Sequence, residues 1–249
     1  MKQLILMALA AFIFASCDKE SDTPRPVIIS GTGNITAKVN EFRALLGSTL
    51  NTTKGHTEGR REINWDGVPD MFATQKLPFD FFNPVADGSP ENLQRGFLYS
   101  TDTDARISSS AFTNLEPANG TEFFSFSGSK TFSAVSSNLW NVEFEVAGAR
   151  VAASVNGFGA VFSDVDDPAS TSIEYFSGNR SLGTYFVPVH SGSSHSFLGV
   201  YFPNEKVTKV RIMQGAATVG AGVKDISVGG TKDLVIMDDF LYDEPVAIQ

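Results

Sequence analysis

The segment LWNVEFEV, residues Leu139 to Val146, carries the pattern that decides the fold class. Its apolar residues at 142, 144 and 146 alternate with polar residues at 141, 143 and 145. An alternation with a period of two buries one face of a β-strand and leaves the other face in water. This segment therefore predicts a strand in an antiparallel sheet with one solvated face.

Similar short segments continue on both sides of this strand, separated by turns rich in Gly, Asn, Asp, Ser and Pro. They span residues 96–100, 105–110, 123–126, 131–135, 155–162, 172–176, 182–189, 196–202, 207–214 and 233–242. About ten short strands with regular turns are typical of a two-sheet antiparallel β-sandwich. We predict an all-β sandwich that is jelly-roll-like. The glycines within 155–162 indicate a close approach of two backbones or a bulge.

One short helix is expected before the strands begin. Ile35, Val39, Phe42 and Leu46 recur near helical spacing, and Gly47 is a suitable stop. We expect this helix to cap one end of the core.

The N-terminus has the features of a processing signal. Lys2 precedes the apolar run Leu4–Phe14, which is shorter than the roughly 20 residues needed to cross a bilayer. The run leads into Phe14-Ala15-Ser16-Cys17, which resembles the lipobox of bacterial lipoproteins. The resemblance implies that residues 1–16 are removed and that Cys17 is acylated and anchors the protein to the membrane. The alternative is an ordinary secretory signal in which the cysteine is incidental.

Cys17 is the only cysteine of the chain, which favours the lipoprotein interpretation and excludes a disulfide within the chain. The acidic run Asp18–Asp22 resembles the surface-export signal of lipoproteins from the Bacteroides–Flavobacterium group. This resemblance implies an outer-membrane lipoprotein exposed at the cell surface, with a periplasm-facing position as the alternative. We expect residues 17–33 to form the lipidated cysteine and a flexible tether, and residues 34–249 to form a single domain.

The net charge of −9 excludes a nucleic-acid-binding role, because such proteins need a basic face. An acidic protein suits calcium, sugars or a neutral partner. Calcium prefers six to eight oxygen ligands from carboxylates and carbonyls on flexible loops. Asp164, Asp166 and Asp167 lie close together in such a loop, and we predict a calcium site there, with Asp238 as a further candidate ligand. The alternative is that the loop aspartates only shape a turn before Pro168.

Asp238 and Asp239 lie side by side in the last predicted strand. On an alternating strand, one of the two carboxylates must point into the core, where an unpaired charge is costly. It therefore needs a metal, an arginine or backbone donors. We predict a structural ion pair between Arg60 or Arg61 and one of these aspartates, so that the segment 59–83 joins the N-terminal helix to the last strand.

Trp65 and Trp140 are candidate platforms for stacking on a sugar ring. The alternative for both is a place in the core.

Several short motifs in order resemble a family of uncharacterised secreted bacterial proteins. They are residues 59–68 (GRREINWDGV), 80–83, 95–97, 157–166, 181–183, 197–200 and 237–240. The resemblance implies little about activity. The last strand is also similar to the closing strand of jelly-roll carbohydrate-binding modules, which implies a glycan ligand.

No catalytic motif is present, neither a zinc-binding His-Glu-x-x-His nor a Gly-x-Ser-x-Gly nucleophile turn. We therefore predict a lipid-anchored cell-envelope binding protein, glycan-binding and calcium-stabilised, rather than an enzyme. The alternatives are a structural or adhesion protein with no small ligand, and a glycan-active hydrolase or lyase on the same scaffold.

Overall fold

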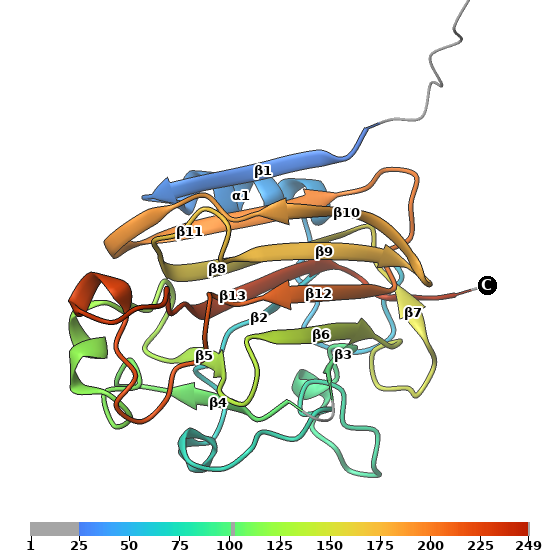
Figure 1. Cartoon of the computed structure of the whole chain (residues 1–249). Helices are drawn as coiled ribbons and strands as arrows, with labels where there is room; N and C mark the ends of the chain where they lie inside the picture. Colours follow the sequence, from blue (N-terminus) through green and yellow to red (C-terminus); the bar gives the residue numbers. More distant parts are fainter. Residues whose placement is uncertain (1–24, 101–102, 249) are drawn as a thin grey trace, which may run out of the picture.

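The structure is a computed structural model that describes residues 25–100 and 103–248 (Figure 1). The predicted signal segment, Cys17 and residues 18–24 of the predicted tether lie outside these residues. The helices are α1 (Thr36–Leu46) and the short 3₁₀ helices η1 (Asp70–Ala73), η2 (Glu91–Leu93), η3 (Pro117–Thr121) and η4 (Ile226–Val228). The strands are β1 (Val27–Gly33), β2 (Arg60–Ile63), β3 (Phe97–Tyr99), β4 (Ala105–Ser108), β5 (Thr131–Ala134), β6 (Leu139–Phe144), β7 (Ala153–Ser154), β8 (Gly157–Val165), β9 (Ser172–Ser177), β10 (Arg180–Phe186), β11 (His190–Tyr201), β12 (Lys209–Met213), β13 (Ile236–Asp243) and β14 (Val246–Ala247).

The strands form two large antiparallel sheets arranged as a sandwich, which confirms the predicted fold class. One sheet has the order β1-β11-β8-β13-β5-β4, with β2 also paired to β13, and the other has the order β10-β9-β12-β6-β3. From β5 onward the chain alternates between the sheets, with β5, β8, β11 and β13 in the first and β6, β9, β10 and β12 in the second. This arrangement of eight strands is the jelly roll, built from two Greek keys.

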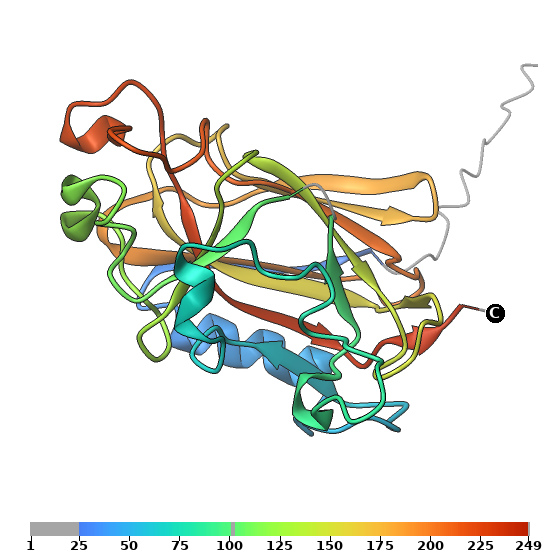
Figure 2. The same cartoon turned by 90° about the horizontal axis from the view of Figure 1, so that it is seen from below.

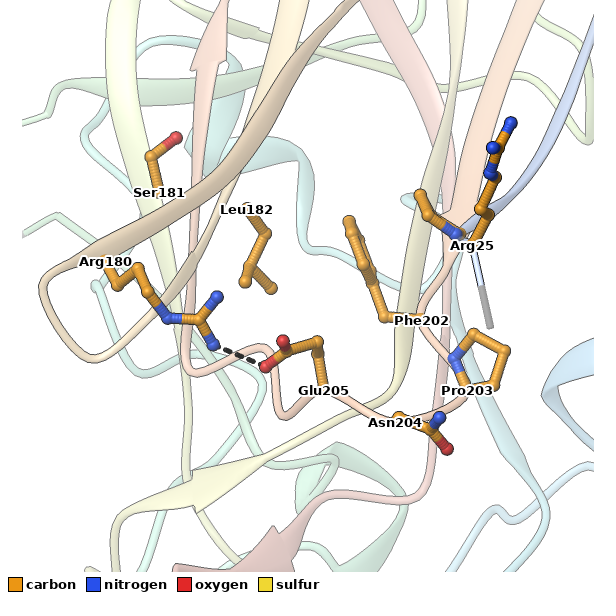
Figure 3. Close-up of a pocket in the computed structure, with 9 residues that line it drawn as sticks. Arg25, Arg180, Ser181, Leu182, Phe202, Pro203, Asn204 and Glu205 are labelled. Carbon is orange, nitrogen blue, oxygen red and sulfur yellow. Dashed lines mark hydrogen bonds and ion pairs between the residues drawn. The ribbon is translucent and has the colours of Figure 1, made fainter. Parts of the chain in front are cut away.

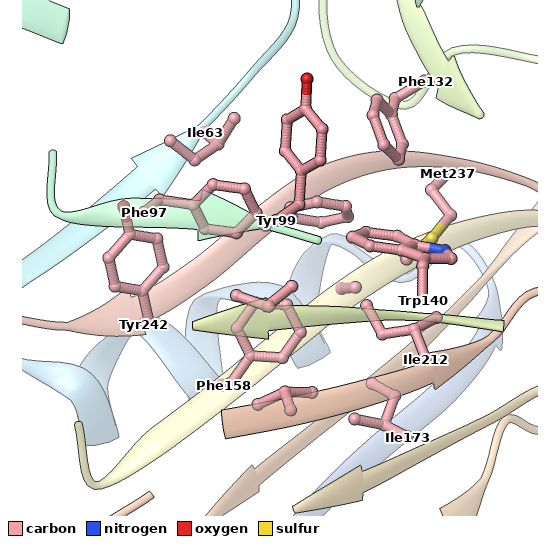
Figure 4. Close-up of a cluster of buried hydrophobic side chains, with 14 of the residues drawn as sticks. Ile63, Phe97, Tyr99, Phe132, Trp140, Phe158, Ile173, Ile212, Met237 and Tyr242 are labelled. Atoms are coloured by element: carbon pink, nitrogen blue, oxygen red, sulfur yellow. The ribbon is translucent and has the colours of Figure 1, made fainter. Parts of the chain in front are cut away.

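Both tryptophans lie in the core between the sheets. Trp65 is fully buried and stacks on Phe132 with a ring-centroid distance of 4.2 Å. Trp140 is 2% exposed and lies among the side chains drawn in Figure 4. The predicted ligand-binding role of Trp65 and Trp140 is therefore wrong, because a ring without exposed surface cannot stack on a sugar.

Helix α1 covers the outer face of the larger sheet instead of one end of the core, so the predicted end cap is wrong. Val39, Phe42 and Leu46 are buried and pack with Val161 of β8 and Phe197 of β11. The apolar face of the helix is thus buried against a sheet, which is the usual way in which an amphipathic helix is stabilised.

Two glycines create the place for the Phe42 ring. Gly159 of β8 and Gly199 of β11 are paired across the sheet. A Cβ atom at Gly159 would lie 2.7 Å from the Phe42 ring, and one at Gly199 would lie 2.8 Å from it. A Cβ at Gly159 would also lie 2.9 Å from the Cα of Gly199, so the glycines allow the expected close backbone approach and, in addition, make room for a helix side chain.

The predicted tether ends earlier than expected. Residues Val27–Gly33 form β1, which pairs with β11 along its whole length, from Val27 opposite Tyr201 to Gly33 opposite His195. The sequence prediction missed this strand because its alternating residues include Ser, Thr and Gly, which also occur in linkers.

The segment beginning at Gly59 joins α1 to the last strand, as predicted, but through other partners. Arg43 of α1 donates two hydrogen bonds to the carboxylate of Glu62 in β2, at 2.9 and 2.8 Å. Strand β2 then pairs with β13, with Arg61 opposite Tyr242 and Arg60 opposite Asp243.

This register makes the predicted ion pairs with Asp238 and Asp239 wrong. Arg60 pairs with Glu62 at 2.7 Å, and Arg61 pairs with Glu244 at 2.7 Å, because both arginines lie beyond the aspartates along β13. Arg61 and Glu244 have side-chain exposures of 0% and 2%. Further donors and acceptors complete the pair, because Asn51 Nδ2 donates to Glu244 and Arg61 donates to the carbonyls of Thr53 and Gln94.

We expect Arg61→Met to destabilise the protein by about 3–5 kcal/mol, since it leaves the Glu244 carboxylate buried without its cation. The double variant Arg61→Met/Glu244→Leu should cost less than the sum of the two single changes. Urea unfolding of the four proteins in this double-mutant cycle measures the coupling. Additive losses would contradict a coupled buried pair.

Candidate metal centre

A group of carboxylates lies at one end of the sandwich, among the loops that carry η3 and η4. Figures 1 and 2 both show these loops at the end opposite to the start of β1 and to the C-terminal residues. We call this group the acidic cluster, and its members are Glu122, Asp164, Asp166, Asp225 and Asp233.

The acidic cluster consists of two triads that share Asp225. In each triad, one oxygen from every residue lies within 4.8 Å of the others. The first triad contains Glu122, Asp164 and Asp225, and the second contains Asp166, Asp225 and Asp233. Because both triads contain Asp225, they form one continuous group of carboxylates.

Local backbone features hold Asp225 and Asp233 in place. Asp225 is the N-cap of η4, and its carboxylate accepts hydrogen bonds from the N–H groups of Ser227 and Leu234, at 2.7 and 2.6 Å. The carboxylate of Asp233 accepts from the N–H groups of Asp166 and Asp167, at 3.3 and 3.1 Å. These contacts join the loop after β8 to the loop before β13.

Glu122 and Asp164 complete the first triad from other elements. Glu122 follows η3 and accepts hydrogen bonds from the hydroxyls of Thr121 and Ser227, at 2.9 and 2.6 Å. Asp164 is buried near the end of β8 and has a φ of +66°, in the region that non-glycine residues rarely adopt. The centre is therefore assembled from four separate parts of the chain.

The electrostatic environment of the cluster opposes ionisation. Burial and the nearby carboxylates of Asp225 and Asp233 raise the pKa of Asp166 to about 6, and burial raises the pKa of Asp233. Within residues 25–100 and 103–248, no ion pair to lysine or arginine involves Glu122, Asp166, Asp225 or Asp233. Buried carboxylates in such numbers need a counter-charge.

The donor set fits a hard divalent cation. All candidate ligands are carboxylate oxygens, and they come mainly from loops, as calcium prefers. In the described part of the chain, the buried Oδ1 atom of Asp166 has no hydrogen-bond partner, which leaves an acceptor free for an ion. Zinc favours nitrogen and sulfur ligands, which neither triad contains.

The four predicted metal ligands separate into two groups. Asp164 and Asp166 belong to the acidic cluster. Asp167 is exposed, and its Oδ1 accepts a hydrogen bond from Ala169 N at 2.8 Å, so it shapes the turn as the alternative interpretation stated. Asp238, the further candidate ligand, belongs to neither triad among the described residues.

The sequence prediction missed Glu122, Asp225 and Asp233. One signal was available, because Asp225 has the position of an N-cap residue before a short helix. No local pattern relates residue 122 to residue 225, since only the jelly-roll connections bring their loops together.

Asp238 and Asp239 form a second acidic feature in the middle of β13. The pairing of β13 with β8 shifts by one residue between Met237 and Phe240, so the two aspartates occupy a β-bulge. The bulge allows both Met237 and Phe240 to face the core. Simple alternation was therefore the wrong model for this strand.

Backbone donors, one of the three predicted solutions, hold one oxygen of Asp238, while its buried Oδ1 has no hydrogen-bond partner among the described residues. Asp238 Oδ2 accepts from the N–H groups of Phe126 and Ser127, at 2.6 and 3.2 Å. Asp239 Oδ1 accepts from the Ser127 hydroxyl at 2.6 Å. The indole N–H of Trp65 donates to the backbone carbonyl of Asp238 at 3.0 Å, so the bulge is held from two directions.

Burial opposes the ionisation of both bulge carboxyls. Burial and the neighbouring Asp239 raise the pKa of Asp238 to about 8, and burial also raises the pKa of Asp239. Asp239 lines a cavity of about 280 Å³ together with Arg43, Glu62 and Arg95. Asp238 is 1% exposed and cannot itself contact a molecule in that cavity.

A scan of the chain against protein-family models gives no match, and a search of curated proteins gives no significant match. Separately, no described helix is long and apolar enough to cross a membrane.

We expect Asp238→Asn to flatten the dependence of stability on pH. Because the folded pKa of Asp238 lies above its ordinary value of 3.8, the folded protein binds more protons than the unfolded chain between about pH 4 and pH 8. Wild-type stability therefore falls as the pH rises through this window. Asparagine keeps the acceptor for both backbone N–H groups and does not titrate, so the variant should be the more stable protein at pH 8.

Urea unfolding at several pH values measures this effect, with the exposed Asp87→Asn as the matched control that keeps the wild-type slope. Parallel stability curves for Asp238→Asn and wild type would contradict the shifted pKa.

Proposed function

We propose that this protein is a lipid-anchored binding protein of the cell envelope, and that the acidic cluster holds a calcium ion. The observation that carries the calcium proposal is the convergence of five carboxylates, four of which have no cationic partner in the described part of the chain. The lipid anchor rests on the lipobox resemblance at Cys17.

Calcium at this place would act as a structural cross-link. A bound ion neutralises carboxylates that otherwise repel one another, and it connects the loop after η3, the end of β8 and the loops around η4. In a jelly roll, such loops present binding residues at the end of the sandwich, and their order depends on what holds them. The ion would therefore order the loops at this end of the sandwich.

The open face of the smaller sheet supports a glycan as the ligand. A cross-strand row on this face contains Thr184 of β10, Glu174 of β9, Arg211 of β12 and Asn141 of β6. Arg211 donates to Asn141 Oδ1 at 3.3 Å, and its side chain is 40% exposed. Such a row offers donors and acceptors at the spacing of adjacent strands, which suits the hydroxyl groups of a sugar chain.

A structural or adhesion protein without a small ligand is the second candidate. The scarcity of exposed aromatic rings favours this candidate. Phe186 is the one strongly exposed aromatic residue on the described part of this sheet. Its cross-strand row continues through Ser172 and Met213 to the exposed Leu139, so the face combines a polar row with an apolar row. A flat face of this kind suits a protein partner.

We expect calcium to raise the melting temperature of the wild-type protein and chelation to lower it. At a free concentration of about 100 times the dissociation constant, binding contributes about 2.7 kcal/mol, which corresponds to roughly 5–10 °C for a domain of this size. Asp166→Asn should lose most of this shift, because it removes one charged ligand. In chelator, however, the variant should be at least as stable as wild type, because a repulsive charge is gone.

The exposed Asp87→Asn serves as the control and should keep the full calcium shift. A melting temperature that does not respond to calcium, or a full shift in Asp166→Asn, would argue against the site.

We expect a glycan-array screen of the Cys17→Ser protein in calcium to find a ligand that Arg211→Ala loses, because Arg211 lies at the centre of the polar row. Arg106→Ala is the matched control, since Arg106 is also part-buried, lies in a strand and pairs with a neighbouring aspartate, but belongs to the other sheet. Failure of wild type to bind any glycan would favour the second candidate.

A further inference from the structure

The end of the sandwich opposite the acidic cluster has a different surface. We call it the N-terminal end face, because β1 begins there. It comprises Arg25, Pro26, Val151, Arg180, Phe202–Lys206 and Val246–Ile248. Figures 1 and 2 show the start of β1, the β9–β10 turn and the C-terminal residues at this same end.

Direct contacts make this surface continuous. Arg25, Arg180, Leu182 and the segment Phe202–Glu205 line a cavity of about 310 Å³ (Figure 3). Lys206, the next residue, lines a second hollow with Val246–Ile248. The N–H group of Ile248 donates to the carbonyl of Ala152 at 3.1 Å, which brings Val151 to the same surface.

Aliphatic and cationic side chains are mixed on the N-terminal end face. Val151, Val246 and Ile248 are 46%, 43% and 50% exposed. Arg25 and Lys206 are exposed, and the Arg180 side chain is 61% exposed beside Glu205. The side chains named here carry three cations and Glu205, and the part-buried Asp243 carboxylate lies near Lys206, so this end is less acidic than the end that holds the acidic cluster.

The length of chain before β1 restricts which surface can meet the membrane. Seven residues separate Cys17 from Arg25, and the eight residue-to-residue steps, at 3.3–3.6 Å each, reach at most about 29 Å. As a flexible coil they would span about 15 Å. The twelve residues of β11 alone extend about 40 Å along the sandwich. An acylated Cys17 therefore keeps the start of β1 within about 29 Å of the lipid, so the N-terminal end face is the surface that the anchor holds nearest to the membrane.

We propose that the N-terminal end face rests on the lipid surface to which Cys17 is anchored. Val151, Val246 and Ile248 enter the interfacial layer, and Arg25, Arg180 and Lys206 approach the phosphate groups of anionic lipids. The acidic cluster then points away from the membrane. This inference rests on the proposed lipid anchor, because such a small apolar area binds a bilayer only when an acyl chain holds it there.

The test uses the full-length acylated protein in vesicles of phosphatidylethanolamine and phosphatidylglycerol. Cys17 is the only cysteine and is consumed by acylation, so an introduced cysteine is the only free thiol. Ile248→Cys places a fluorescent label on the N-terminal end face, and Val223→Cys places the same label beside the acidic cluster. Val223 is the matched control because it is also an exposed aliphatic residue, at 37%.

We expect lipids that carry a spin-label quencher to quench the label at residue 248 several-fold more strongly than the label at residue 223. The variant Arg180→Ala/Lys206→Ala should weaken the quenching at residue 248, and high salt should have the same effect. Equal quenching at both positions, or no quenching at residue 248, overturns the proposal. Energy transfer between labelled copies at residue 248 without lipid quenching also overturns it and identifies a second copy as the occupant.

The mass of the N-terminal peptide and the membrane fraction of Cys17→Ser separate the two proposals. An acylated protein whose residue 248 remains unquenched overturns only the orientation. A chain without acyl groups, or a Cys17→Ser protein that stays in the membrane fraction, overturns the anchor and the orientation together.

Discussion

The pairing of β13 along both of its edges is the constraint on which the rest of the structure depends. One edge pairs with β8, while the other is shared by β5 and β2. Asp233 lies just before this strand in the acidic cluster, the bulge lies at its middle, and Glu244 follows its end in the buried ion pair with Arg61. A shift in the register of β13 therefore displaces Asp233 of the acidic cluster, the bulge and the ion pair together.

The sequence predicted the parts of the fold that depend on local periodicity. The alternation at Leu139–Val146 predicted an inward face and an outward face, and the structure shows Trp140, Val142 and Phe144 in the core. The helix before Gly47 was also predicted close to its observed bounds. Regular turn spacing was sufficient for the jelly roll, because an antiparallel sandwich of this size has few alternatives.

The candidate site could be predicted only in part, for physical reasons that particular residues make clear. Asp164, at the end of β8, and Asp166, in the loop that follows, are close in sequence and were found, whereas Glu122 and Asp225 reach them only through the fold. The bulge at Asp238 changes the alternation by one residue, and a pattern with a period of two cannot show such a change. Tryptophan is a residue type that stacks on sugars, but Trp65 and Trp140 are buried in the core. The sequence could not show this, because the burial of a side chain depends on how the whole core packs.

The order in which the strands occur in the chain has a consequence for export. Strand β1 pairs with β11, and β2 pairs with β13. Both N-terminal strands therefore pair with strands that lie more than a hundred residues later in the chain. Long-range pairing of this kind makes folding slow and delays it until the late strands are present. A chain that crosses a membrane from its N-terminus therefore cannot complete its sheets before its last strand has crossed. For the proposed export, this order of pairing means that β1 and β2 remain unpaired until the late strands have followed.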